Sequence, residues 1–128
     1  MSEIINPQDA ELEEVILGSC LIESKAITLI ADILRPEAFY NEKNLEIYAT
    51  LQSMYRNGQK IDIITVKEEL TRRGKLEFIG GPYTLAHISG RVASSAHLEY
   101  HARILKQKYI RRETILGFHK LLALAADE

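Results

Sequence analysis

The pattern of apolar and polar positions predicts helices along the whole chain. The first should start at Asn6 and Pro7, which are typical of a helix N-cap and first turn. Its apolar residues recur every three or four positions up to Leu21, as expected for a helix with one side buried. Gly18 interrupts this pattern at a cost in helix stability, so we expect a close neighbour there.

Two more helices are expected in the first half. Ser24 is the candidate N-cap of the second, whose apolar positions span 27–34. Pro36 should end it, because the residue before a proline disfavours helical angles. The third should begin after an N-cap at Asn41 and end at Asn57.

Residues 61–88 predict a helix, a hinge and the start of another helix. Asp62 or Thr65 can cap the first of these helices. Gly74 follows two arginines, as at a helix end with cations near its negative pole. Two glycines precede Pro82, which suits a first helical position.

The last helix, capped by Ser94 or Ser95, should run from Ala96 nearly to the end. Its first half has one apolar seam, formed by Leu98, Ala102, Leu105 and Tyr109. Its second half is apolar more broadly, with Ile110, Ile115, Leu116, Phe118, Leu121, Leu122 and Leu124. The seam fits an internal core and a partner surface equally well, and both interpretations stay open.

The predicted class is all-α: a compact multi-helix head followed by a long helix that begins a helical hairpin. We divide the chain into a globular head at residues 1–93 and the long helix at 94–128, within one domain overall. The 128 residues suffice for a modest core. The apolar second half of the long helix predicts contact with another helix, from a continuation or a second chain.

The overall charge argues against a dedicated nucleic-acid-binding domain, since the chain has a net charge of −2 and a pI of about 6.1. Cys20 is the only cysteine, so no disulfide can form within one chain, and a reducing compartment fits. We expect a buried, inert thiol there. No signal peptide or membrane-spanning apolar run is visible, which predicts a cytoplasmic protein without membrane contact.

No catalytic or cofactor motif stands out. The glycines before Lys75 and Pro82 lack the spacing of a phosphate-binding loop and fit helix punctuation. His97 and His101 could share a helix face as metal ligands do, but no third ligand is evident, although Glu13 or His87 could lie nearby in space. Solvated histidines are the preferred interpretation, and we expect no catalytic, cofactor or metal residue in this chain.

Charged groups give weaker signals. The acid pairs at 13–14 and 68–69 fit solvated helix faces. Two basic clusters could meet phosphates, although salt-bridged or solvated faces are favoured. They comprise Arg72, Arg73 and Lys75, and Lys106, Lys108, Arg111 and Arg112.

The order of several short motifs resembles the N-terminal domain of the bacterial replicative DNA helicase of the DnaB type. The matching segments are Asn6-Pro7 with Ala10-Glu11 and Val15-Ile16-Leu17-Gly18; Leu34-Arg35-Pro36-Glu37-Ala38-Phe39-Tyr40; Asp62-Ile63-Ile64-Thr65-Val66 with Glu69-Leu70; Gly80-Gly81 with Leu85; and Glu99-Tyr100, Ala102-Arg103-Ile104 and Lys108. No single segment is specific, but their order and spacing are. The resemblance covers nearly the whole chain.

The chain departs from the family pattern at several positions. Ala38 replaces an acidic residue, Thr84 stands where tyrosine is usual, and Ala93 stands where proline often precedes the long helix. His97 and His101 replace asparagine and tyrosine, which weakens the metal hypothesis further.

The resemblance implies a non-catalytic assembly domain. In that family, hairpins pair between subunits, and the N-terminal domains form a collar, a trimer of dimers, on a hexameric ring that binds primase and contributes to contacts with the helicase loader. ATP, Mg²⁺ and most DNA contacts belong to a C-terminal motor that drives ATP-dependent DNA unwinding. The chain is expected to end within or just after the first hairpin arm.

We assign self-association and primase-type contacts to separate residues. The self-association residues are Leu98, Leu105, Tyr109, Leu116 and Leu121; the primase-type residues are Tyr83, Ile115, Phe118 and Leu122. Two alternatives stay open: a small helical nucleic-acid-binding regulator that uses its basic last helix, and the helicase-binding domain of primase.

Overall fold

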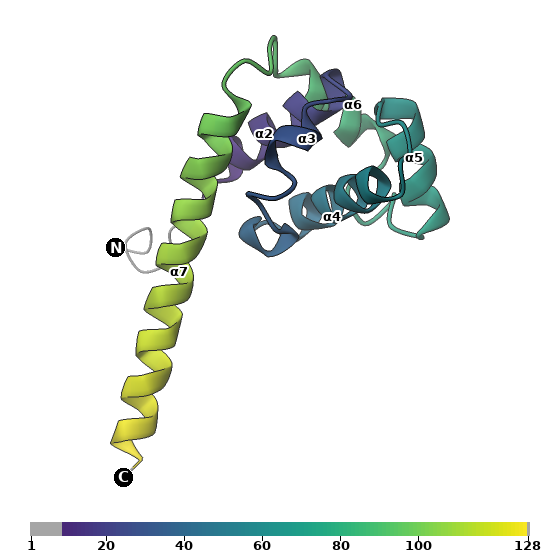
Figure 1. Cartoon of the computed structure of the whole chain (residues 1–128). Helices are drawn as coiled ribbons and strands as arrows, with labels where there is room; N and C mark the ends of the chain where they lie inside the picture. The colour runs from purple at the N-terminus through teal and green to yellow at the C-terminus, as the bar shows by residue number, and fades with distance from the viewer. Residues whose placement is uncertain (1–8, 128) are drawn as a thin grey trace.

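A computed structural model describes residues 9–127, which form a helical head and a long projecting helix (Figure 1). The elements in chain order are α2 (Ala10–Ile22), α3 (Ile27–Ile30), the short 3-10 helix η1 (Pro36–Ala38), α4 (Glu42–Arg56), α5 (Ile63–Arg72), α6 (Pro82–Gly90) and α7 (Leu98–Ala126). No strand occurs among residues 9–127, and the all-α class is confirmed.

Helix α2 lies at the centre of the head and contacts α4, α6 and α7. Its buried residues Ile16, Leu17 and Cys20 are fully enclosed. At Gly18, an added Cβ would lie 2.6 Å from the Ile88 carbonyl oxygen of α6. The predicted close neighbour is confirmed: α6 can approach this near only because position 18 has no side chain.

The start of α2 is set by Asp9 within the described residues. Its carboxylate accepts a hydrogen bond of 3.0 Å from the Leu12 amide, as an N-cap does. The helix start predicted at Asn6 and Pro7 lies outside the described residues.

Helix α3 is shorter than predicted. It spans four residues, its N-cap position is Ala26 without a side-chain hydrogen bond, and Ser24 does not cap it. The segment that follows α3 is held by side chains of α4: Tyr48 donates to the Leu34 carbonyl at 3.1 Å, and Gln52 donates to the Ala31 carbonyl at 3.1 Å. These side chains satisfy carbonyls that the end of a helix leaves without intrahelical partners.

Helices α4 and α5 begin at their predicted caps. Asn41 accepts bonds from two amides at the start of α4. Asp62 and Thr65 form a reciprocal capping box at the start of α5, so both candidates take part. Gly58 and Gly74 follow the two helices at φ values of 70° and 71°, a conformation that glycine adopts without strain.

The hinge between α5 and α6 ends as predicted, with Pro82 as the first residue of α6. Gly80 and Gly81 precede it with φ values of 107° and 84°. At Gly80, an added Cβ would also meet the Thr84 hydroxyl. The two glycines therefore allow the turn before α6, which supports their interpretation as residues that separate two helices.

Helix α7 begins after His97, and neither Ser94 nor Ser95 caps it by a side chain. Ser94 instead accepts a hydrogen bond from the Ala96 amide in the preceding loop. The helix is 29 residues long, as the pattern predicted to within two residues at its start. Its first half lies against the head, and its second half extends beyond it (Figure 1).

Candidate assembly surface on the long helix

The first half of α7 belongs to the core of the head. Leu98, Ala102 and Leu105 are buried against this chain's own helices, since α7 contacts α2, α3 and η1. Tyr109 is half-buried and packs against the same cluster. Leu98 and Leu105 therefore lack the exposed surface that self-association needs, and the predicted seam is an internal contact.

Arg112 occupies the next position of the seam, three residues after Tyr109, although it is not apolar. This side chain is only 4% exposed. Its guanidinium carbon lies 5.1 Å from the ring centre of Tyr40 and 5.5 Å from that of Tyr109, and one nitrogen donates to the Ala38 carbonyl at 3.4 Å. Cation–π attraction and a charge-assisted hydrogen bond thus join α7 to η1 and to the segment that follows it.

Arg112 changes the interpretation of the basic cluster on α7. Its charge is turned into the head, so it does not belong to a phosphate-binding face with Lys106, Lys108 and Arg111. The sequence held a signal for this, because Arg112 follows Tyr109 by three residues and keeps the spacing of the seam.

Glu13 orders the segment that Arg112 contacts. Its carboxylate accepts hydrogen bonds from the Tyr40 amide at 2.7 Å, the Asn41 amide at 3.3 Å and the Asn44 side chain at 3.0 Å. The residue is 1% exposed, so the expectation of a solvated face at Glu13 is wrong. Burial raises the pKa of Glu13, while these hydrogen bonds and the charge of Arg112 oppose the rise.

In the second acid pair, Glu68 is exposed as expected, but the expectation is wrong for Glu69. Glu69 is buried and forms ion pairs with Arg72 and Arg73. Hydrogen bonds from these two arginines hold the pKa of Glu69 below its ordinary value. The favoured interpretation of this basic cluster as salt-bridged holds for both arginines, and Lys75 lies 4.0 Å from a Glu46 oxygen.

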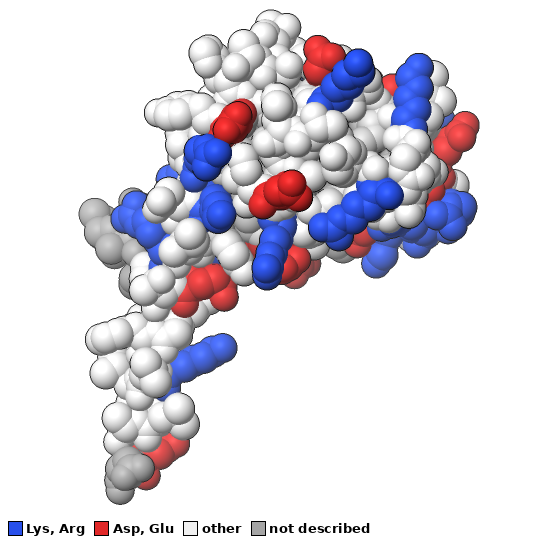
Figure 2. Space-filling view, in the orientation of Figure 1, with Lys and Arg blue, Asp and Glu red and all other residues white. Residues whose placement is uncertain are grey.

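The second half of α7 exposes apolar residues on all sides. Between 46% and 67% of the surface of Leu116, Phe118, Leu121, Leu122 and Leu124 is accessible, and Ile115 is half-buried. Figure 2 shows this projecting part with few charged groups. Such a concentration of exposed apolar side chains on one helix is typical of a surface that another protein segment covers.

These residues fall on different sides of the helix. Ile115, Phe118 and Leu122 share one side, because they are three and four residues apart. Leu116 continues the line of the seam, and Leu121 lies about 140° around the helix from it. The structure brings the three primase-type residues of α7 together, but it does not place the two remaining self-association residues on one stripe.

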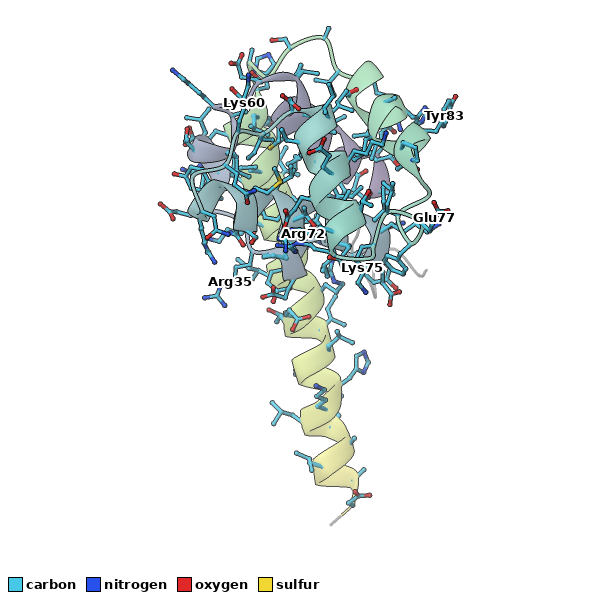
Figure 3. All side chains as sticks on the ribbon, turned by 90° about the vertical axis from the view of Figure 1, so that its right-hand side faces the viewer. Arg35, Lys60, Arg72, Lys75, Glu77 and Tyr83 are labelled. Carbon is cyan, nitrogen blue, oxygen red and sulfur yellow. The ribbon has the colours of Figure 1, made fainter. Side chains whose placement is uncertain are left out.

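Tyr83 lies apart from these residues. It sits on α6 with 79% of its surface exposed, at the edge of the head in Figure 3, whereas α7 ends far from it. Its ring stacks on His87 with centres 6.4 Å apart, beside a groove of about 360 Å³ between α4 and α6. The fourth primase-type residue thus belongs to a separate surface.

The structure offers no metal centre in its described part. The rings of His97 and His101 have centres 6.3 Å apart, and no group of three potential ligands occurs among residues 9–127. Cys20 is buried, and burial raises the pKa of its thiol to about 12. Over the same residues, no helix is long and apolar enough to cross a membrane.

Comparisons with known proteins agree with this architecture. The family model described as DnaB-like helicase N terminal domain matches residues 5–107. The replicative DNA helicase DnaB of Rhodothermus marinus is 43% identical over 108 residues, which are 84% of this chain and 12% of that protein. The replicative DNA helicase DnaC of Bacillus subtilis (strain 168) is 33% identical over 119 residues, 90% of this chain and 26% of that protein. The chain thus spans about an eighth to a quarter of these relatives.

Solved structures show the same fold. The N-terminal domain of DnaB helicase from Mycobacterium tuberculosis superimposes with a TM-score of 0.89 at 30% identity, covering 94% of this chain and 88% of that one. A DnaB-like replicative helicase, whose structure describes its interactions with primase, gives a TM-score of 0.79 at 27% identity over 94% of this chain and 28% of that one. The family resemblance found in the sequence is confirmed: this chain belongs to the family of DnaB-like helicase N-terminal domains.

Proposed function

We propose that this chain is the assembly and partner-binding domain of a replicative DNA helicase and has no catalytic role of its own. In this proposal the whole protein unwinds duplex DNA with ATP and Mg²⁺ bound outside the chain, in the cytoplasm. The chain contributes to an N-terminal collar on a hexamer and offers binding surfaces for primase and the helicase loader. The exposed apolar second half of α7 carries the proposal, because water-exposed leucines at this density need a partner.

Self-association is assigned to Leu116 and Leu121, with Tyr109 at the junction to the head. Because these residues lie on different sides of α7, a bundle of several helices covers them better than one flat contact. Leu98 and Leu105 leave this proposal, since they stabilise the head itself.

Primase binding is assigned to the side of α7 that carries Ile115, Phe118 and Leu122, with Tyr83 as a second, separate contact. Two facts support this part: the three residues form one apolar stripe, and one structural relative is described with its interactions with primase. A partner helix laid along the stripe would use the recurring mode of an apolar face against an apolar groove.

A single charge on α7 tests the self-association. Leu116→Asp should lower the solution mass measured by light scattering, because an unpaired carboxylate is costly to bury in a helix bundle. Gln107→Asp is the matched control, since it adds the same charge at an exposed position on the half of α7 that the head supports. A Leu116→Asp mass equal to that of the wild type, or a monomeric wild type, would contradict the proposal.

Primase binding has its own test. Phe118→Asp should weaken the binding of an isolated helicase-binding domain of primase in calorimetry by about tenfold or more, the effect of losing a buried apolar anchor. The control is Tyr100→Asp, a change at an exposed aromatic near the start of α7. Equal losses for both variants would show that the stripe is not the primase contact.

A further inference from the structure

A second surface lies where α7 passes the segment between α3 and η1. A pocket of about 310 Å³ opens there, between residues 32–38 of the head and residues 106–110 of α7. It is separate from the second half of α7 and from the groove beside Tyr83. The half of α7 that lines it packs against the head.

The floor of the pocket is apolar. Ile33 and Tyr109 are half-buried and pack against the core, and Ile110 lines the outer side with 46% of its surface exposed. The Tyr109 ring is held by the guanidinium of Arg112 at 5.5 Å, so its orientation is set before any partner arrives. A pocket of this size with an apolar floor can accept one large apolar side chain.

The rim of the pocket is charged. Arg35 and Lys106 are exposed cations on its two sides, and Asp32 is an exposed acid beside them. Arg35 projects outward from the head in Figure 3. The adjoining residues 103–111 of α7 carry four cations and no acid, and one of the four, Arg103, is paired with Glu99 at 2.9 Å. The whole chain, by contrast, has a net charge of −2. The surroundings of the pocket therefore attract negative charge.

We propose that this pocket docks a short acidic segment of a partner protein. One large apolar side chain of the segment enters between Ile33, Tyr109 and Ile110, and carboxylates on either side of it pair with Arg35 and Lys106. Charge complementarity selects an acidic partner, and the apolar floor requires that the segment also carry a leucine or an aromatic residue.

A nucleic acid fits the pocket less well. Single-strand binding uses aromatic faces on which bases stack, but Arg112 already occupies the Tyr109 ring within the chain. Asp32 on the rim opposes phosphates and carboxylates alike, so the environment of the Tyr109 ring, and not the rim charge, favours a peptide. The inference goes beyond the proposed function, because its partner is neither a second copy of this chain nor primase on the stripe of Ile115, Phe118 and Leu122. The pocket shares only Tyr109 with the residues assigned to self-association.

The test uses the chain itself and a defined peptide. The probe is a fluorescein-labelled peptide in which a leucine–phenylalanine pair is flanked by glutamates, followed by fluorescence anisotropy. The same peptide with glutamines in place of the glutamates should bind about tenfold more weakly, the effect of losing charge-assisted contacts. Arg35→Glu and Lys106→Glu should each weaken binding of the acidic peptide by a similar factor.

Further variants separate the pocket from general charge effects. Lys67→Glu makes the same charge change on α5, which lies on the other side of the head from α7 in Figure 1, and should leave the affinity nearly unchanged. Asp32→Asn should strengthen binding about two- to threefold, because it removes the one opposing charge on the rim. Ile110→Ser should weaken binding of the glutamate peptide and of the glutamine peptide by the same factor, because it removes part of the apolar floor.

Several results would overturn the inference. These are no binding by the wild type, equal loss with Lys67→Glu, or tighter binding of a single-stranded oligonucleotide that the Arg35 and Lys106 variants abolish. A change in solution mass with Lys106→Glu would show that a second copy covers the pocket instead. Leu116→Asp should not alter peptide affinity, so failure here is distinguishable from failure of the proposed assembly function.

Discussion

The two halves of α7 both carry large apolar residues but lie in different surroundings. In residues 98–112, the side chains on one face are buried in the head: Leu98 and Leu105 are at most 1% exposed. In residues 113–126, Leu116 continues the same face and is 46% exposed, because the head no longer reaches it. Arg112 is the last side chain of α7 that is buried within the chain's described part.

The difference separates stability from assembly on one continuous helix. A helix gains most of its stability from packing its apolar face, and the first half obtains this within the chain. The second half extends the helix without that support and keeps its apolar groups available to another protein. Mutations in the first half should therefore report on folding, and mutations in the second half on binding.

The largest contrast is expected between two leucines eleven residues apart. Leu105→Ala should lower the free energy of unfolding by about 2–5 kcal/mol, since it leaves a cavity in the core. Leu116→Ala should change it by no more than about 0.5 kcal/mol, as at an exposed site. Urea unfolding followed by circular dichroism measures both.

This comparison requires dilute protein, because self-association would add stability through Leu116. A concentration series therefore serves as the control for each variant. Equal destabilisation by the two substitutions at the lowest concentration would mean that the second half of α7 also folds against the head.

The boundary between the halves should respond to Arg112. Arg112→Ala should cost about 1–3 kcal/mol, because it removes two cation–π contacts, the hydrogen bond to Ala38 and the packing of a long side chain. The adjacent Arg111 is exposed and provides the matched control, Arg111→Ala. Thermal unfolding measures the melting temperature of both variants. Equal melting temperatures would contradict the role of Arg112 as the last stabilising contact between α7 and the head.

Much of the fold could be predicted from local signals. Asn41, Asp62 and Pro82 mark helix starts because each acts on backbone groups within three residues of itself. Gly18 also predicted a close neighbour, which is Ile88 of α6, because a glycine inside a helix costs stability unless another element must approach closely.

Predictions failed where distant residues decide the outcome. The carbonyls that follow α3 are bound by Tyr48 and Gln52, which lie 14 and 21 residues beyond them in sequence. Ser94 resembles an N-cap but serves the loop before α7. Glu13 was placed in water because its partners Tyr40, Asn41 and Asn44 are about 30 residues away in sequence.

The candidate surface was predictable only in part. Spacing identified which residues of α7 are apolar, but it could not separate Leu105 from Leu116, because both continue one seam. What separates them is the extent of the head along α7, a tertiary property. The primase-type stripe and self-association on the second half remain predictions.

The smallest expected effect concerns the pH dependence that Glu13 gives to the head. Burial raises the pKa of Glu13 above its ordinary value of 4.5, so just above this pH the folded state holds a proton that the unfolded chain has released. The stability of the wild type relative to Glu13→Gln should therefore fall as pH rises through this interval, and then level off. Urea unfolding between pH 4 and pH 7, values chosen to span the interval, measures the difference.

Arg112 allows the same experiment to probe the junction with α7. Its charge favours the ionised form of Glu13, so in an Arg112→Ala background the fall should extend to higher pH. If the fall in stability covers the same pH range with and without Arg112, Glu13 and Arg112 do not interact across the junction. A relative stability that rises with pH would show instead that the hydrogen bonds from Tyr40, Asn41 and Asn44 outweigh the burial of the carboxylate.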